Sequence, residues 1–238
     1  ALYLNSTKIN SVNVAFIANT AVDSGGAVYA YSTTGSVVNN TFANNTASSS
    51  GSALYNAYST LVVDNTIIYN NTAPTTAITQ ANTSSFTTWR YSNVQSSGGS
   101  TAWTAAFGTD GGSNIDSNPL FVSTTNFMGG DNVFATGDDG LLLASGSPSG
   151  NTALATGAPA EDLIGRTRPL GTGVDMGAYE GVAGIDPFVQ FRVSGNAFTE
   201  SIGTVLVPVT LSAIQTSAVT VGYSAKSSGT AFGFGNDY

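Results

Sequence analysis

The chain has 238 residues, of which 8% are charged, and a net charge of −8. Its six basic residues form no cluster, which argues against a nucleic-acid partner. Cysteine and histidine are absent, which excludes a thiolate zinc site, a disulfide framework and a histidine general base. The longest apolar runs, such as GLLLA at 140–144, are too short to span a membrane. Abundant Ser, Thr, Asn and Gly are typical of a bacterial secreted or surface protein.

The first part of the chain repeats an asparagine-rich phrase at equal intervals. NVAFIANTA at 13–21 returns as NNTFANNTA at 39–47 and again as NTIIYNNTA at 65–73. A fixed period of about 26 residues indicates a solenoid. Three loops aligned without gaps share the same residue in these columns: Ala1/Ala27/Ala53, Tyr3/Tyr29/Tyr55, Asn13/Asn39/Asn65, Asn19/Asn45/Asn71, Thr20/Thr46/Thr72 and Ala21/Ala47/Ala73.

The local pattern selects the type of solenoid. Segments such as VYAYS and LVVDNTIIY are rich in β-branched and aromatic residues, glycines separate them, and no helical period appears. We therefore predict an all-β fold, a parallel β-helix in which each coil contributes about three short strands. Stacked coils place like residues in columns. The expected core column is Phe16, Phe42 and Ile68, and the expected structural ladders are Asn13/Asn39/Asn65 and Asn19/Asn45/Asn71 at turns.

The organisation changes along the chain. Residues 1–97 are predicted to form the coils, although 79–97 lose the regular spacing while keeping an alternating aromatic character. Residues 98–184 are rich in Gly and Asp with short strand-like pieces, and we expect irregular terminal coils, loops and a linker that cap the solenoid. Residues 185–238 read as strands of a separate module.

Four ordered motifs carry a family resemblance: SNVQ (92–95), GSNIDSNPLFV (112–122), DGLLLASGSPSGNTA (139–153) and RTRPLGTGVDMGAYE (166–180). They resemble the C-terminal part of bacterial secreted right-handed parallel β-helix proteins of the choice-of-anchor type. The upstream repeats resemble those of polymorphic outer-membrane proteins. The resemblance implies a right-handed β-helix exported to the cell surface or the medium, and it implies no single activity.

A second resemblance begins after residue 184. The stretch from VQFRVSGNAFTESIG to FGFGNDY is similar to the first half of a Calx-beta domain, an immunoglobulin-like β-sandwich. Val205–Leu211 alternates as a half-buried sandwich strand does. The family pattern continues beyond the final Asp-Tyr pair. We therefore expect the remaining strands further along a longer polypeptide, with strands from a neighbouring chain as the alternative.

Two groups of acidic residues are metal candidates. The Calx-beta resemblance implies calcium binding, and by motif match Glu200 and Asp237 are the positions that would carry it. Asp131, Asp138 and Asp139 form the densest acidic cluster, for which turn chemistry with backbone N–H donors is the alternative. No cofactor is required, and calcium is the one cation that the sequence suggests.

Aromatic and charged residues bear on carbohydrate chemistry. Tyr3, Tyr29 and Tyr55, joined by Tyr31 and Tyr58, are a candidate strip for stacking against sugars, and the alternative is that the column packs inward or lies along a coil edge. Hydrolysis needs two facing carboxylates. The three repeats contain only Lys8, Asp23 and Asp64 as charged residues, at unrelated positions of the repeat. We therefore predict no enzyme in this segment.

Three functions compete. The first is an extracellular structural or adhesive surface protein, a rigid rod that contacts itself, other cells or glycans. The second is a polysaccharide lyase or hydrolase whose catalytic coils lie outside this segment. The third is a filament subunit whose sandwich is completed by a neighbour's strand. The first is the prediction, with no nucleic-acid partner and no membrane span in this segment.

Overall fold

The computed structural model describes residues 1–181, 189–191 and 209–211. The chain divides into two compact units, Ala1–Asp186 and Pro187–Tyr238. In the second unit, β16 (Val189–Phe191) pairs antiparallel with β17 (Val209–Leu211). The rest of the predicted Calx-beta module lies outside the described residues.

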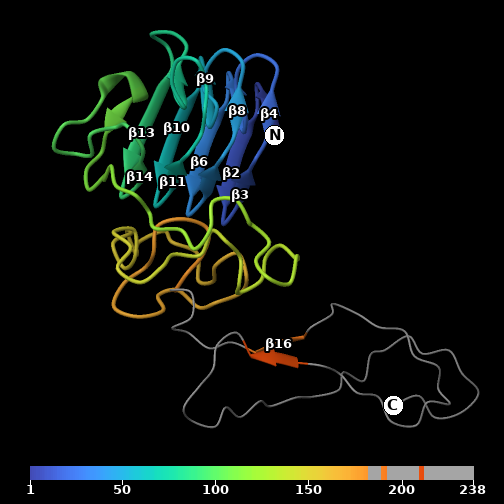
Figure 1. The fold of residues 1–238 in the computed structure, drawn as a ribbon. Coiled ribbons are helices and arrows are strands. Elements are labelled where there is room, and N and C mark those ends of the chain that lie inside the picture. The colour runs from blue at the N-terminus through green and yellow to red at the C-terminus, as the bar shows by residue number, and fades with distance from the viewer. Residues whose placement is uncertain (182–188, 192–208, 212–238) are drawn as a thin grey trace, which may run out of the picture. The chain divides into compact units, whose positions relative to one another are not determined.

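The first unit is a parallel β-solenoid whose coils pass through three long sheets and one short one (Figure 1). Sheet A contains β1 (Leu2–Asn5), β5 (Val28–Tyr31), β9 (Leu54–Ala57) and β12 (Ile78–Gln80). Sheet B contains β2 (Lys8–Val12), β6 (Thr34–Val38), β10 (Thr60–Asp64), β13 (Phe86–Arg90) and β15 (Thr109–Asp110). Sheet C contains β3 (Ala15–Ile17), β7 (Thr41–Ala43), β11 (Ile67–Tyr69) and β14 (Asn93–Val94). Sheet D contains β4 (Thr20–Ala21) and β8 (Thr46–Ala47).

Neighbouring strands pair in the register that the repeat predicts. Tyr3 lies beside Tyr29 and Tyr29 beside Tyr55, while Phe16 lies beside Phe42 and Phe42 beside Ile68. The prediction of an all-β parallel solenoid with about 26 residues per coil is therefore confirmed.

The fourth coil differs from the first three in the lengths of its turns, which is why the regular spacing of the sequence repeat ends at residue 78. Ile78 pairs with Leu54, where the regular repeat would have placed Gln80. Phe86 nevertheless pairs with Thr60, and Asn93 with Ile67, at the full spacing of the repeat. The turn before β12 is therefore shorter than its predecessors, and a longer connection after β12 makes up the difference. The register of sheets B and C is thus kept.

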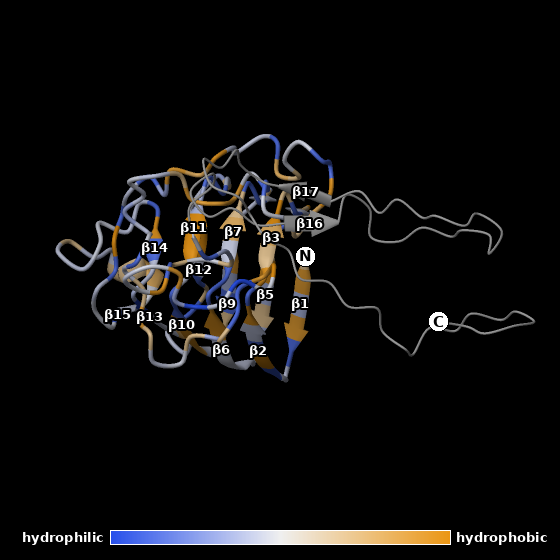
Figure 2. Cartoon of the chain, turned by 90° about the horizontal axis from the view of Figure 1, so that it is seen from below, coloured by the Kyte–Doolittle hydropathy of each residue, from blue (hydrophilic) through white to orange (hydrophobic). Residues whose placement is uncertain are grey.

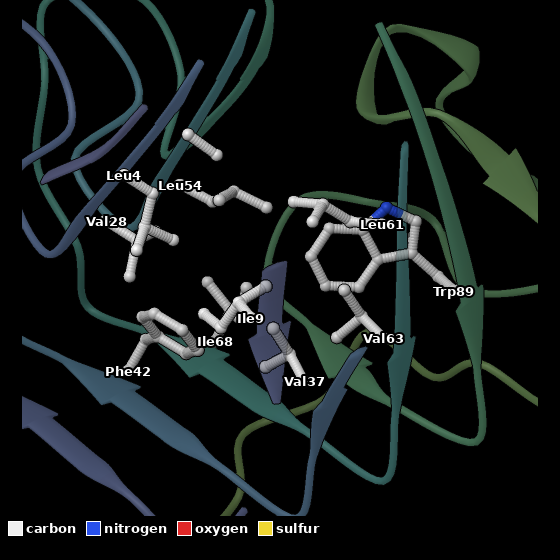
Figure 3. Close-up of a pocket in the computed structure, with 11 residues that line it drawn as sticks. Leu4, Ile9, Val28, Val37, Phe42, Leu54, Leu61, Val63, Ile68 and Trp89 are labelled. Atoms are coloured by element: carbon white, nitrogen blue, oxygen red, sulfur yellow. The ribbon is translucent and has the colours of Figure 1, made fainter. Parts of the chain in front are cut away.

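Side chains from sheets A, B and C meet inside the coils and form the core (Figure 3). The rings of Phe16 and Phe42 are stacked, with centroids 4.7 Å apart, and Ile68 continues the same column with 1% of its surface exposed. The space left between the core side chains amounts to about 10 Å³. That volume is at the lower limit for one water molecule, so the side chains of this core are closely packed.

Each corner of the coil combines a left-handed residue with a polar side chain that bonds the adjacent coil. At the corner after sheet C, Ala18, Asn44 and Asn70 have φ of 51–56°. The next residues form an amide ladder, in which Asn19 Nδ2 donates to Asn45 Oδ1 at 2.9 Å and Asn45 Nδ2 donates to Asn71 Oδ1 at 2.8 Å. Side-chain oxygens of Asn, Thr and Ser make equivalent bonds to backbone N–H groups at the other corners.

The far end of the solenoid is closed by residues 98–116. The short 3₁₀ helix η1 (Ala105–Phe107) places Phe107 against Trp103 and the core. Trp89 is fully buried beneath it and donates its Nε1–H to the carbonyl oxygen of Phe107 at 2.8 Å. β15 then pairs with β13 and covers part of the sheet B edge.

Residues 117–181, which we call the flanking segment, do not cap the end of the solenoid as we expected of this region. They pack against the outer face of sheet C (Figure 1, yellow to orange). Two strands of that sheet, β3 (AFI) and β11 (IIY), contain only apolar or aromatic residues, and β11 is the most hydrophobic of the sheet in Figure 2. Ala43 and Ile67 point outward. Ala43 belongs to one further apolar cluster with Leu142, and Ile67 belongs to another with Leu143 and Met176. The flanking segment therefore supplies a second core.

The Asn13/Asn39/Asn65 column anchors the flanking segment. All three residues are left-handed, with φ of 51–53°, which turns their side chains away from the coil. Their amide nitrogens donate to backbone carbonyls of the flanking segment, at Glu161 (2.6 Å), Asp175 (3.0 Å) and Leu154 (2.8 Å) respectively. One ladder bond remains, from Asn65 to Asn39 at 3.1 Å.

A buried ion pair organises the C-terminal motif of the flanking segment. Arg168 Nη1 lies 2.6 Å from Glu180 Oε2, and the two side chains are 1% and 0% exposed. Glu180 also accepts N–H groups of Leu170 and Asp175, and Arg168 donates to the Gly177 carbonyl. Burial raises the pKa of Glu180 and lowers the pKa of Arg168, so each charge depends on its partner.

A second buried carboxylate, Asp139, gives the fold a pH dependence. It accepts bonds from the Tyr179 hydroxyl and from the Ala135 N–H, but burial outweighs these bonds and raises its pKa. Because the folded pKa is above the unfolded one, the folded chain takes up this proton first as pH falls. We expect Asp139 to add stability as pH falls from neutral towards the ordinary carboxyl range.

Thermal melts at neutral pH and at mildly acidic pH measure this contribution. We expect the melting temperature to be raised at mildly acidic pH by the protonation of Asp139, and Asp139→Asn should reduce this gain relative to neutral pH. Asp23→Asn removes an equal charge from an exposed position and should leave the gain nearly unchanged. If both variants show the gain of the wild type, Asp139 is not the group responsible.

Candidate functional site

The outer face of sheet A and the corner that follows it carry five tyrosines, which we call the tyrosine face: Tyr3, Tyr29, Tyr31, Tyr55 and Tyr58. Strand alternation explains their position, since Val28 and Ala30 point into the core while Tyr29 and Tyr31 point outward. The tyrosine face thus contains the whole candidate strip, and the inward alternative does not apply.

Three of these rings stack on one another. The centroids of Tyr3 and Tyr29 are 5.3 Å apart with an interplanar angle of 29°, and those of Tyr29 and Tyr55 are 4.7 Å apart at 23°. Tyr3 at the end of the stack is 68% exposed. Stacking uses the ring faces within the column, so this column presents mainly ring edges and hydroxyl groups to solvent.

The phenol group at the centre of the stack stays protonated at neutral pH. Burial raises the pKa of Tyr29, and the neighbouring hydroxyls of Tyr55 and Tyr3 raise it further. The Tyr29 side chain therefore offers an uncharged O–H group that both donates and accepts hydrogen bonds.

Tyr31 and Tyr58 are arranged differently. Their centroids are 5.5 Å apart at an interplanar angle of 70°, so one ring meets the other edge-on. They are 39% and 55% exposed. In the strand register Tyr31 stands between Asn5 and Ala57, both uncharged.

Charged side chains on sheet B do not form a catalytic arrangement. Arg90 binds Asp64 through two hydrogen bonds of 2.7 and 2.6 Å. Lys8 lies in a different column of the sheet, in register with Thr34. The residues in register with Asp64 on either side are Val38 and Arg90, so no second carboxylate faces it within the described sheet. Glycoside hydrolysis needs such a pair.

The carboxylates of the acidic cluster, Asp131, Asp138 and Asp139, accept hydrogen bonds from backbone N–H groups of the flanking segment. Asp138 accepts the Gly130 N–H at 2.7 Å, and Asp131 accepts the Val133 N–H at 2.8 Å. Asp139 is buried against Tyr179. These contacts are the turn chemistry that was the alternative to a metal site.

The described part of the chain contains no group of three acidic side chains arranged as a cation would require. The other two calcium candidates, Glu200 and Asp237, lie outside the described residues.

Two open grooves border the flanking segment. One, of about 470 Å³, lies at the first coil between Phe16, Ile17, Phe134 and Leu163. The other, of about 590 Å³, runs between Tyr69 and residues 120–125. Neither groove contains a buried, unpartnered polar group among its lining residues.

Sequence reasoning did not find the roles of Arg168, Glu180 and Tyr179. These residues stand in the quoted motif RTRPLGTGVDMGAYE, but nothing in their spacing shows that they are buried. Their side-chain hydrogen bonds are made within the flanking segment and with Asn13, and Tyr179 also packs in the apolar cluster that contains Ala43 of sheet C, so the motif serves the structure and attachment of the segment.

Comparison with known proteins identifies no relative of this chain. No family model matches the chain, and neither a curated protein nor a solved structure matches it. The described residues contain no helix with the length and apolar character of a membrane span.

Proposed function

We propose that this chain is the rod-like part of a bacterial extracellular surface protein with a structural and adhesive role. In this proposal the coil is right-handed, as the family resemblance implies, and the side of the rod contacts glycans or other copies of the protein. The observation that carries the proposal is the tyrosine face, an exposed and uncharged aromatic surface on a sheet held in register over successive coils.

Two physical features support an adhesive role. Tyrosine combines an apolar ring with a polar hydroxyl, which suits contact surfaces that are wet before binding. The ladders and the second core hold the strands in fixed register, so the tyrosine face loses little conformational entropy when it binds. The Calx-beta-like module would follow the rod as a further surface domain.

The test uses microspheres coated with the whole chain. We expect them to be retained on surfaces coated with the same chain or with polysaccharide, and heat-unfolded chain should abolish this retention. Folded chain that is retained on neither surface would contradict the proposal. Turnover of any polysaccharide in a panel of acidic and neutral polymers would favour the enzyme instead.

A further inference from the structure

The tyrosine face contains two kinds of aromatic surface, which differ in how many ring faces they leave free for a ligand. In the Tyr3/Tyr29/Tyr55 column, Tyr29 is stacked on both faces at 4.7–5.3 Å, while Tyr3, 68% exposed at the end of the stack, keeps its outer face free. In the Tyr31–Tyr58 pair the rings meet at 70°, so the ring that presents its edge keeps both faces free of its partner. Exposure of 39% and 55% shows that solvent reaches these rings.

A third exposed aromatic residue lies at the same corner, where the chain passes from sheet A to sheet B. Phe86, 56% exposed, donates its backbone N–H to the Ser59 carbonyl, directly after Tyr58 in the preceding coil. Tyr31, Tyr58 and Phe86 therefore occur once each in three successive coils, and we call them the corner aromatics. The three residues stand in different register columns, since Tyr31 pairs with Ala57 and Phe86 with Thr60, so their rings are offset along the strands as well as from coil to coil.

The corner aromatics are held in place before any ligand arrives. Tyr58 has a left-handed backbone with φ of 55°, and its N–H is fixed by the Ser85 hydroxyl at 2.9 Å. Tyr31 lies in β5, with a paired strand on each side. Little ordering is therefore needed on binding, which favours affinity.

The direct neighbours of the corner aromatics favour a neutral ligand. The strand neighbours of Tyr31 are Asn5 and Ala57, and those of Phe86 include Thr60, none of which carries a charge. The cation of this corner is Lys8 in the first coil, which heads the column of Phe86 with Thr34 and Thr60 between them. The C–H faces of a pyranose pack on the electron-rich faces of aromatic rings. Asn5 offers an exposed amide to the hydroxyl groups around such a ring.

We propose that the corner aromatics bind a neutral polysaccharide, with sugar units packed on the free faces of Tyr31, Tyr58 and Phe86. This inference rests on the proposed function and names the ligand class and the residues of that contact. The stacked column contributes rigidity to the tyrosine face and presents mainly ring edges, with one free ring face at Tyr3.

The experiment measures binding of the whole chain to soluble β-1,4-glucan and galactomannan by affinity electrophoresis, with polygalacturonate as the acidic comparison. The double variant Tyr31→Ala/Tyr58→Ala should weaken binding to a neutral polymer by about tenfold, because two aromatic contacts are lost. Tyr58→Phe keeps the ring face and should bind nearly as the wild type does. Phe134→Ala is the matched control, because it removes a comparably exposed ring (51%) from the flanking segment outside the tyrosine face, and it should bind normally. Circular dichroism checks that each variant is folded.

Three results would overturn the inference while leaving the proposed function intact. The first is equal loss of binding in Phe134→Ala and in the double variant. The second is self-association of the chain without binding to any neutral polysaccharide. Tighter binding to polygalacturonate than to the neutral polymers would also overturn it, because it would show recognition of charge. Absence of both self-association and polysaccharide binding would remove the proposed function as well.

Discussion

Arg168→Met is expected to destabilise the flanking segment by about 3–5 kcal/mol, because it leaves the Glu180 carboxylate buried without its partner. The two side chains are 1% and 0% exposed, so water cannot replace the guanidinium. Bonds from Arg168 to the Gly177 carbonyl and to Asn13 are lost as well. Hydrogen exchange should show reduced protection in residues 139–181, while the coils around Trp89 stay protected.

Arg90→Met is the matched control for this prediction. Arg90 also forms an ion pair with two hydrogen bonds, but its side chain is 42% exposed. Surface pairs contribute about 0–1 kcal/mol, so this variant should unfold at nearly the same denaturant concentration as the wild type. Equal losses in the two variants would show that burial is not what makes the Arg168 pair important.

The neutralised double variant separates the charge from the shape of the pair. Arg168→Met/Glu180→Gln removes both charges and should recover part of the stability that Arg168→Met loses. Recovery should be incomplete, because Glu180 accepts N–H groups on both oxygens and a glutamine NH₂ cannot accept. A double variant less stable than the single one would contradict this account.

The solenoid was predictable because the same short sequence pattern recurs at a constant interval. A constant repeat length determines which side chains lie side by side, so the Phe16–Phe42 stack and the Asn19–Asn45 bond follow from counting. The position of the flanking segment had a weaker signal. β11 reads IIY, apolar on both faces, and such a strand is buried on both faces. That pattern could have indicated a cover on sheet C, although not which residues provide it.

The candidate site was predictable only in part. Alternation correctly suggests that Tyr29 and Tyr31 share a face, but the angle between two rings depends on rotamers that the sequence does not encode locally. Tyr58, one ring of the edge-on pair with Tyr31, also has a left-handed backbone, an unusual conformation for an aromatic residue that its sequence does not announce. The burial of Arg168 and Glu180 depends on long-range packing, so local pattern reasoning could not reach it.

Gly35→Ala is expected to detach the first coil, at a cost of about 3 kcal/mol or more. A β-carbon at Gly35 would lie 1.9 Å from the carbonyl oxygen of Ile9, and the backbone φ of +142° is one that L-residues rarely adopt. The obstacle is backbone of the adjacent strand β2, so no side-chain rotation can relieve it. Solenoid coils contact mainly their neighbours, and β10 and β13 should therefore keep their hydrogen-exchange protection while β2 loses it.

Gly112→Ala distinguishes this clash from the conformational cost alone. Gly112 also has a positive φ, +103°, but no atom lies within 4 Å of the added carbon. Its cost should be about 1–2 kcal/mol, the penalty for a left-handed L-residue. If Gly35→Ala is no worse than Gly112→Ala, then β2 and β6 can move apart without losing the coil, and the close approach of these two strands is not what holds the first coil in place.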